Sequence, residues 1–416
     1  MTLATHLRCD DCAAEFPLGG PMTVCPACGG LLEVCYDLDR APGDLFDRAA
    51  ANRADGMWRW RALLPLAVGT APVTLGEGDS PLLDAAGLGA SIGVPGLLLK
   101  NDAMMPTGSF KDRGFAVALS MAAQWGLRRG FTYSSGNAGA SFAAYAARAG
   151  LRATVFVESY ANPVKVAAIS LYGAAVYRLH YESAADVFAA VQELSRAGEH
   201  SFVNFINPFR HEAMKTYAYE ICESLGWQVP DVMVHPVGTG GGLWGAWKGF
   251  RELHRLGRID RLPRMVGVQP AACAPLVDAF DRGAAETGTV GDVTATMAQS
   301  IAGDAMIHGG RRVLRAIRDS GGCAVAVSEG QIGEAVRMLG GAAVAAEPSA
   351  AAALAGVVAA RDGGRIAAGD RVVAVVTGSA LKQPAALTDL APAPTGDVDA
   401  DPRQWRTVLD RPVVAR

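Results

Sequence analysis

Residues 104–114 read MMPTGSFKDRG, and the alanine-rich run 115–124 that follows them predicts a helix. Lys111 comes after a turn containing Gly108 and directly after Phe110, so it opens this helix. An ammonium ion is disfavoured there because it faces the positive end of the helix dipole. A lysine that acts as a neutral amine, for example to form a Schiff base with an aldehyde, suits the position. The alternative is an ordinary exposed lysine at a helix start.

Apolar segments alternate with alanine-rich helical runs between about residues 97 and 380. The pattern predicts strands at 97–100, 153–157, 232–237, 265–268 and 371–376. Such alternation is typical of a mostly parallel α/β architecture. Several of these strands run into glycine-rich turns that open helices, and ligands gather at the carboxyl ends of such strands.

The composition excludes several classes of protein. The chain has 416 residues, of which 50% are hydrophobic and 19% charged, with a net charge of −3. This is a globular composition with enough apolar content for two or three domains. Without a basic field we expect no nucleic-acid partner and no membrane partner. The first residues lack the apolar core of a signal peptide, and we expect a cytoplasmic protein.

Five of the eight cysteines lie in the first 35 residues. Two C-x2-C pairs, separated by twelve residues, predict a zinc ribbon over 1–40 with four thiolate ligands, Cys9, Cys12, Cys25 and Cys28. Four ligands leave no open position on Zn²⁺, so its role would be structural. The alternative is a knuckle without metal. Cys35 falls outside the pattern, and we expect it to be buried in a strand over 31–36.

A glycine-rich loop follows the strand expected at 232–237, with the sequence Gly238, Thr239, Gly240, Gly241, Gly242. Converging backbone N–H groups and a helix N-terminus make an anion cradle. No P-loop lysine follows, and the dinucleotide fingerprint fails at Leu243. The loop therefore predicts a site for a single small phosphate, and close backbone packing is the alternative.

Two further turns follow predicted strands. The first presents Ser134, Ser135, Gly136 and Asn137 at a helix N-terminus, which suits a carboxylate. The second presents the neutral hydroxyl groups of Thr377 and Ser379. Taken in isolation, each turn is better explained as a plain helix cap.

Taken together and in this order, these elements resemble the threonine synthase family of fold-type II pyridoxal-phosphate enzymes. The resemblance extends over most of the chain and rests on CGGLLEV, GMWRWRALLP, LGEGDSPL, PTGSFKDRG, SSGNAGAS, NPFRHEAMKT, VGTGGGLWGAWKGF, EPSAAAALAG and TGSALK. It implies two α/β domains of the tryptophan synthase β-like class in a homodimer. The expected divisions are a zinc ribbon-like segment (1–40), a large domain (41–104 and 211–390), a small domain (105–210) and a tail (391–416) that forms a linker or a surface arm.

The resemblance also implies roles for the motif residues. Lys111 would carry pyridoxal 5′-phosphate, Phe110 would lie near its ring, and the loop 238–242 would hold its phosphate. Asn137 would hydrogen-bond the ring 3′-oxygen. Thr377 would face the ring nitrogen, with Ser379 as the alternative. The substrate's α-carboxylate would be held by the asparagine loop, at Ser134, Ser135 and Ala138.

By the same resemblance the protein would be a lyase of amino-acid biosynthesis that converts O-phosphohomoserine to threonine and phosphate. That substrate needs a second anion pocket, and the candidates are Lys165, Asn204, Asn207, Arg210 and Lys215. We favour Arg210, whose planar fork matches phosphate oxygens. His211, His235 and His308 are expected to be packing or surface residues, with His308 the one to watch for a substrate role.

The sequence departs from the family pattern at Ala138, at His211, Ala213 and Met214, at Thr239 and Gly242, and over 300–310. These positions lie near the expected substrate pocket and leave three alternatives open. One is replacement of the phosphate of O-phosphoserine, as in cysteate synthase. Another is β-elimination, as in serine/threonine dehydratases. The third is a non-catalytic zinc-ribbon binding protein.

Overall fold

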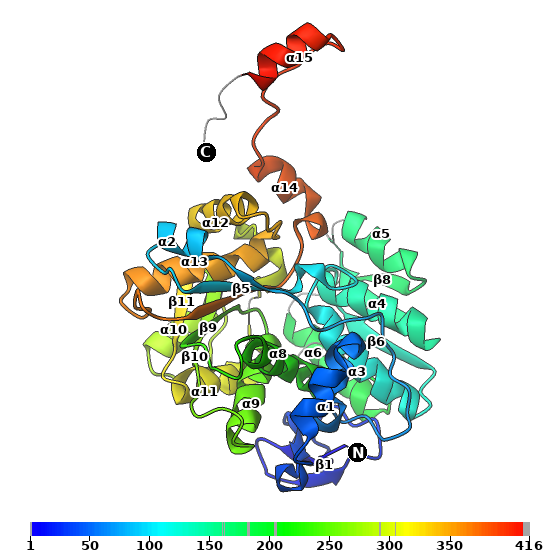
Figure 1. Ribbon diagram of the computed structural model, residues 1–416. Helices are drawn as coiled ribbons and strands as arrows, with labels where there is room; N and C mark the ends of the chain where they lie inside the picture. The colour runs from blue at the N-terminus through cyan, green and yellow to red at the C-terminus, as the bar shows by residue number, and fades with distance from the viewer. Residues whose placement is uncertain are drawn as a thin grey trace.

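The computed structural model describes residues 2–159, 161, 163–180, 184–203, 206–290, 293–303 and 305–410. Its helices and strands form two parallel-type sheets with helical layers and a small N-terminal sheet (Figure 1). The mixed α/β architecture expected from the sequence is confirmed. No helix among these residues is long and apolar enough to cross a membrane.

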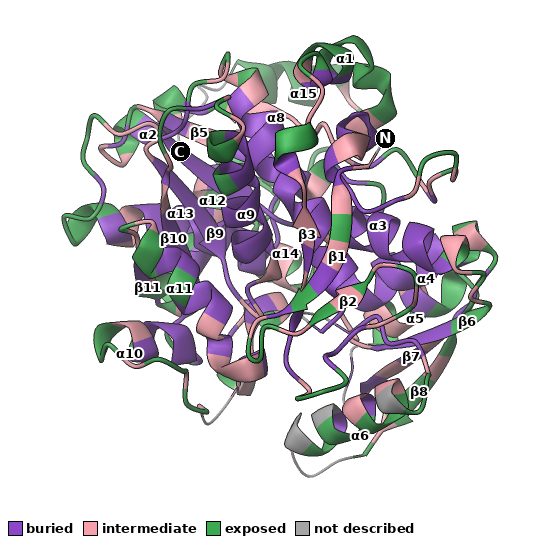
Figure 2. Ribbon diagram, turned by 90° about the horizontal axis from the view of Figure 1, so that it is seen from below, coloured by how far each residue is buried: buried purple, intermediate pink, exposed green. Residues whose placement is uncertain are grey.

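The larger sheet has six strands in the order β11-β10-β9-β12-β5-β4. All neighbours pair in parallel except β4 and β5. The strands are β4 (Leu82–Asp84), β5 (Leu97–Asn101), β9 (Val232–Pro236), β10 (Arg264–Pro270), β11 (Cys323–Val327) and β12 (Val372–Val376). Strands β9 and β12 are buried along their whole length, as a parallel sheet covered on both faces requires. Figure 2 shows β9 in the colour of buried residues.

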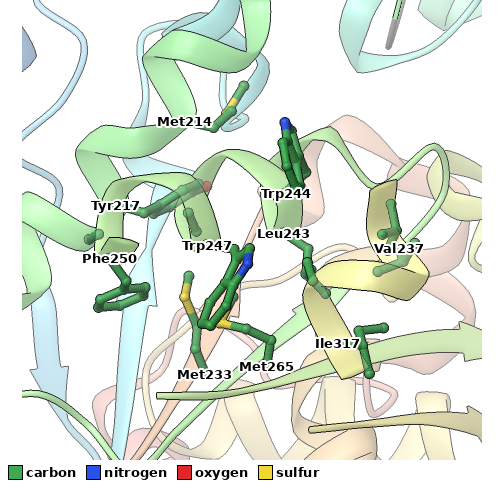
Figure 3. Close-up of a cluster of buried hydrophobic side chains, with 14 of the residues drawn as sticks. Met214, Tyr217, Met233, Val237, Leu243, Trp244, Trp247, Phe250, Met265 and Ile317 are labelled. Carbon is green, nitrogen blue, oxygen red and sulfur yellow. The ribbon is translucent and has the colours of Figure 1, made fainter. Parts of the chain in front are cut away.

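Helices cover both faces of this sheet. On one face Val232 and Val234 pack with α2 (Ala86–Ser91), α12 (Glu329–Gly341) and α13 (Pro348–Asp362). On the other face Met233 and Met265 pack with α8 (Thr216–Ser224), α9 (Gly241–Arg255), α10 (Pro275–Asp281) and α11 (Arg311–Asp319). Figure 3 shows these two methionines beside Trp247 of α9. The alternation of faces follows from the two-residue period of a strand.

The smaller sheet has three parallel strands in the order β6-β7-β8. They are β6 (Arg129–Tyr133), β7 (Arg152–Glu158) and β8 (Ala175–Leu179). Three helices pack against one face in a single apolar cluster with Val155 and Val157, namely α3 (Lys111–Gln124), α4 (Asn137–Ala149) and α5 (Pro163–Leu171). Helix α6 (Ala184–Arg196) packs with Phe131 and Phe156 on the other face.

The N-terminal sheet is antiparallel, with β1 (Ala4–Cys9) between β2 (Glu15–Pro17) and β3 (Leu32–Tyr36). In β3, Leu32 and Val34 face the core, so Cys35 points the other way. Cys35 is therefore half-buried, and the expectation that it would be buried is wrong.

The remaining helices are short. The α-helices are α1 (Leu45–Ala51), α7 (Pro208–Glu212), α14 (Pro384–Leu390) and α15 (Pro402–Leu409). The 3-10 helices are Leu38–Arg40, Arg53–Leu63, Asp102–Met104, Ala213–Lys215, Val293–Ala295, Gln299–Ile301, Ile307–Gly310 and Ala380–Lys382.

The tail differs from its expectation in one respect. It contains α15, which buries none of its residues and stands away from the body at the end of an extended segment (Figure 1). It is not an arm laid on the surface.

Candidate active site

Lys111 is the first residue of α3 and is only partly exposed. Its Nζ lies 4.3 Å from the centroid of the Phe110 ring. Burial strips water from the ammonium ion and, together with the smaller effect of the positive charge of Arg210 and against the opposing charge of Glu347, lowers the pKa of Lys111 to about 7. A substantial fraction of Lys111 is therefore a neutral amine at neutral pH, as a nucleophile or a base requires.

Buried ion pairs fix the start of α3. The guanidinium of Arg113 lies 2.7 Å from Asp102 at the end of β5 and 2.6 Å from Glu220 of α8. Lys100 of β5 also pairs with Glu220, at 2.7 Å. Removing one partner from such a cluster leaves an uncompensated buried charge and costs about 3–5 kcal/mol. Lys111 is two residues from this anchor, so its backbone position is well determined.

The turn before Lys111 is joined to the carboxyl end of β12. The backbone N–H of Phe110 donates to the carbonyl of Thr377 at 2.9 Å, and that of Ser379 donates to Gly108 at 2.9 Å. The Ser379 hydroxyl accepts a hydrogen bond from Leu381 N and so caps a short helix. This leaves the buried Thr377 as the better placed of the two hydroxyl groups for a ligand beside Lys111.

The glycine loop lies next to the same turn. A β-carbon on Gly242 would lie 2.4 Å from the His235 ring and 3.1 Å from Phe110 Cε2. Gly240 has φ +86°, and a β-carbon there would lie 2.3 Å from Val313 Cγ2. Both positions therefore require glycine. Gly240 is the N-cap of α9 and has no side chain to cap it, so the first N–H groups of a 15-residue helix remain for an anion.

Segment 300–310, in which the sequence departs from the family pattern, supports this loop. A β-carbon on Gly238 would lie 3.3 Å from Ile301 Cα. Ser300 N donates to Ser349 Oγ at 2.9 Å and so connects the segment to α13. His308 lies farther along, half-buried beside Arg311, with its pKa lowered by burial.

The asparagine loop connects β6 to α4. A β-carbon on Gly139 would lie 2.2 Å from the Ser134 carbonyl, so the turn needs a glycine. The Ser134 hydroxyl accepts from Gly136 N at 3.2 Å, Ser135 is partly exposed, and Ala138 is buried in the apolar cluster of α3 and α4. Asn137 Nδ2 donates to Glu347 Oε1 at 2.7 Å. Glu347 in turn adjoins Gly378, so this loop also meets the end of β12.

Glu347 is a site residue that was not singled out from the sequence. It precedes Pro348 at the start of α13, and a glutamate before a helix-opening proline reads only as a helix boundary. His235 is also buried beneath Phe110, with ring centroids 5.7 Å apart, and its pKa is lowered to about 4 by burial. It is therefore a neutral packing residue, as is the buried His211, whose pKa burial also lowers.

The five candidates for a second anion site separate clearly in the structure. Asn207 caps α7 through Phe209 N and donates to Ser201 O. Lys215 pairs with Glu212 and Glu252 at 2.9 and 3.0 Å. Lys165 donates to Gln299 Oε1 at 3.2 Å. Asn204 lies outside the described residues.

Arg210 differs from these candidates because it is a buried cation with no carboxylate within ion-pair distance in the described part of the chain. Its Nη1 donates to Phe202 O at 2.8 Å, and its guanidinium lies 4.0 Å above the Phe115 ring. Burial lowers the pKa of Arg210 to about 9. A buried cation without a counter-ion is costly unless an anion binds there.

The four cysteines of the knuckles lie together, with all four sulfur atoms within 4.8 Å of one another. Gly29 has φ +77°, and a β-carbon on Gly30 would lie 2.9 Å from Cys9 Sγ, so both glycines shape the turn. The ribbon docks through Lys248 of α9. This buried lysine donates to the Val34 carbonyl at 2.5 Å and to Glu212 of α7 at 2.7 Å.

The comparisons with known proteins agree with this geometry. A family model for pyridoxal-phosphate dependent enzymes matches residues 73–378. The threonine synthase of Methanocaldococcus jannaschii is 35% identical over 381 residues, covering 91% of this chain and 93% of that protein. The threonine synthase of Methanosarcina acetivorans is 35% identical over 395 residues, covering 94% and 95%.

A solved structure extends the similarity to the fold. The processed form of threonine deaminase isoform 2 from Solanum lycopersicum has a TM-score of 0.63 at 21% identity, covering 85% of this chain and 95% of that one. The expectation of a fold-type II architecture is confirmed.

Proposed function

The chain belongs to the threonine synthase family of pyridoxal-phosphate-dependent enzymes, and from that premise we propose that it converts O-phosphohomoserine to threonine and phosphate. The observation that carries the proposal is the position of Phe110 and Lys111. The Phe110 ring lies next to Gly242, and the backbone N–H of Phe110 donates a hydrogen bond to the carbonyl of Thr377. These contacts support one shared site for a lysine of low pKa, an anion cradle and a hydroxyl at a strand end.

The residues present fit pyridoxal phosphate. Gly240 and Gly242 leave no room for side chains beside uncapped N–H groups, which suits a phosphate. Lys111 would attach the cofactor, Asn137 would bond its 3′-oxygen and Thr377 would face its ring nitrogen. When bound, the cofactor supplies an electron sink for charge that develops on the substrate. A neutral hydroxyl group, rather than a carboxylate, at the ring nitrogen would give a milder sink and favour elimination and replacement over transamination.

Lys111 would also move protons. With substrate bound, the free amine of Lys111 would lie beside the α-carbon and could remove and return the α-proton. A general base is most effective when its pKa is near the working pH, and burial has brought Lys111 to about 7. The fixed start of α3 supports this role, because Arg113 pairs with Asp102 and Asp112 accepts a hydrogen bond from the Thr107 hydroxyl in the turn before Lys111.

Two anion sites would orient the substrate. Ser134, Ser135 and the backbone of Ala138 would hold the α-carboxylate at the start of α4. Arg210 would bind the substrate phosphate, because it is buried, lies near enough to Lys111 to affect its pKa, and pairs with no carboxylate among the described residues. A phosphate would supply the missing counter-charge through two parallel hydrogen bonds.

We also propose a structural Zn²⁺ in the ribbon, supported by the distances among the four sulfur atoms. The ribbon contacts α9, which begins at the phosphate cradle, and α7, which carries Arg210. A folded ribbon would therefore brace both anion sites. We propose a homodimer from the family resemblance, and a reducing cytoplasmic location from a cysteine cluster that suits a metal rather than disulfides. Light scattering and cell fractionation test them.

One set of assays tests the reaction. The purified holoenzyme is incubated separately with O-phosphohomoserine and with O-phosphoserine, each with and without sulfite. Threonine and phosphate from O-phosphohomoserine support the proposal. Sulfite-dependent cysteate from O-phosphoserine would assign a replacement enzyme instead, and a keto acid with ammonia would assign a dehydratase. No turnover and no cofactor absorption would leave a binding protein.

A further inference from the structure

Glu347 is a buried carboxyl group for which the reaction described above has no use. It is 1% exposed and occupies the N-cap of α13. An acidic N-cap side chain normally accepts hydrogen bonds from the first N–H groups of its own helix, but Glu347 accepts none of them. Its backbone N–H donates to the Gly378 carbonyl at 3.0 Å, which fixes the residue against the end of β12. Its side chain is therefore directed to another partner.

That partner is Asn137, which is 210 residues away in sequence. Its amide Nδ2 donates to Glu347 Oε1 at 2.7 Å. A β-carbon on residue 378 would lie 2.5 Å from Oε1 and 3.3 Å from Nδ2. Gly378 thus leaves the space that the pair occupies. The second carboxyl oxygen, Oε2, is shielded from solvent and has no hydrogen-bond partner among the described residues.

The pair determines which way the Asn137 amide points. An ionised carboxylate can only accept hydrogen bonds, so the amide must turn its NH₂ group toward Glu347. The opposite orientation would set the amide oxygen against a carboxylate oxygen. Because the NH₂ group has two hydrogens, one remains for a second acceptor.

The charged groups around Glu347 are lysines. Lys111 of α3, Lys165 of α5 and Lys382, in the short helix after β12, each lower its pKa, whereas burial raises it and is the larger effect. Lys111 is the lysine that would carry the cofactor. Glu347 therefore lies within electrostatic reach of the reacting group while it touches Asn137 directly.

We propose that Glu347 is a positioning residue that holds Asn137 so that its free N–H meets the ring 3′-oxygen of the cofactor. This inference rests on the proposed function, since it requires pyridoxal phosphate between Lys111 and the loop 238–242. Glu347 acts through Asn137 and makes no bond to the substrate.

The test uses the full-length protein and four variants: Glu347→Gln, Glu347→Ala, Asn137→Ala and the double variant with alanine at both positions. Glu334→Ala, on the exposed side of α12, is the surface control. The readouts are the dissociation constant of pyridoxal phosphate, the position of its visible absorption band, and the melting temperature of the cofactor-free protein.

We expect Glu347→Ala and Asn137→Ala each to weaken cofactor binding by about tenfold, the effect of a buried hydrogen bond that loses one partner. The double variant should bind no more weakly than either single variant, because the residues act as one unit. Glu347→Gln keeps the shape of the side chain, but its amide can present either its oxygen or its NH₂ group to Asn137. It should shift the band while the melting temperature stays close to that of the wild type.

The results distinguish a failure of the positioning role of Glu347 from a failure of the proposed function. A normal wild-type band with binding within twofold in both Glu347 variants, or additive losses in the double variant, would overturn the positioning role. A variant series that lowers only the melting temperature would do the same. If the wild-type protein forms no band at all, the proposed function fails and this inference fails with it.

Discussion

The pKa of Lys111 predicts an unusual pH dependence for the capture of pyridoxal phosphate by the cofactor-free protein. Only the neutral amine attacks the aldehyde. The pKa of Lys111 is about 7, whereas that of an ordinary lysine is 10.5. At pH 7 about half of the Lys111 side chains are then neutral, against about one in three thousand for an ordinary lysine. From pH 6 to pH 8 the capture rate should rise about tenfold and then level off, whereas an ordinary lysine would gain about a hundredfold and keep rising.

The assay follows visible absorbance after mixing, with Nα-acetyl-lysine in the same buffers as the control for the ionisation of the aldehyde itself. The direction of the Lys111 pKa shift can be tested a second time by replacing Arg210. Its positive charge helps to lower the pKa of Lys111, so Arg210→Met should raise that pKa and move the plateau to higher pH. A wild-type profile that runs parallel to acetyl-lysine up to about pH 10 would refute the assignment of a buried, neutral amine.

Three further predictions address the cradle, the second anion site and the ribbon. Gly242→Ala should destabilise the protein by about 1–3 kcal/mol and weaken cofactor binding, because the new β-carbon meets the His235 ring. The control, Gly340→Ala on α12, has nothing within 4 Å of its new β-carbon and should leave the stability in urea unfolding unchanged or raise it. Equal effects of the two substitutions would contradict the steric explanation. Arg210→Lys should raise KM for O-phosphohomoserine by about tenfold or more, because lysine lacks the planar guanidinium fork, and should leave the cofactor absorption band in place. An unchanged KM would exclude Arg210 as the phosphate ligand. Cys25→Ser should abolish bound zinc in elemental analysis and lower the melting temperature, and a metal-free wild-type protein of equal stability would contradict a structural Zn²⁺.

The sequence predicts the site where its signals are local. The turn before Lys111, the glycine loop and the asparagine loop each follow a strand within a few residues. Strands β5 and β9 belong to the larger sheet, so parallel pairing places the first two segments at its carboxyl edge. The asparagine loop follows β6 of the smaller sheet and is linked to that edge by the contact between Asn137 and Glu347. The four cysteines are equally local, because their spacing alone brings two knuckles together.

Contacts between distant segments could not be read in this way. Glu347 and Asn137 lie at the N-termini of α13 and α4, which meet beside Gly378 at the end of β12, and the sequence of neither segment indicates this contact. One short stretch of sequence contains three polar residues that could each bind an anion, namely Asn207, Arg210 and Lys215. Only the structure shows that Asn207 caps a helix and that Lys215 pairs with two glutamates. It also shows that Arg210 has no carboxylate within ion-pair distance among the described residues.

Two departures have simple physical causes. Cys35 lies on the outward side of a half-buried strand, where alternation outweighs the usual tendency of cysteine to be buried. Helix α15 forms in a tail that was expected to begin as a linker or a surface arm, because Asp401 caps the helix and Pro402 occupies its first turn. Neither feature touches the candidate active site.

The most direct test is to find which amine carries the cofactor. The wild-type protein is saturated with pyridoxal phosphate, reduced with borohydride, digested, and analysed by mass spectrometry. The account predicts a single pyridoxyl group on the peptide that contains Lys111. Attachment at a different lysine, or no attachment, would contradict it.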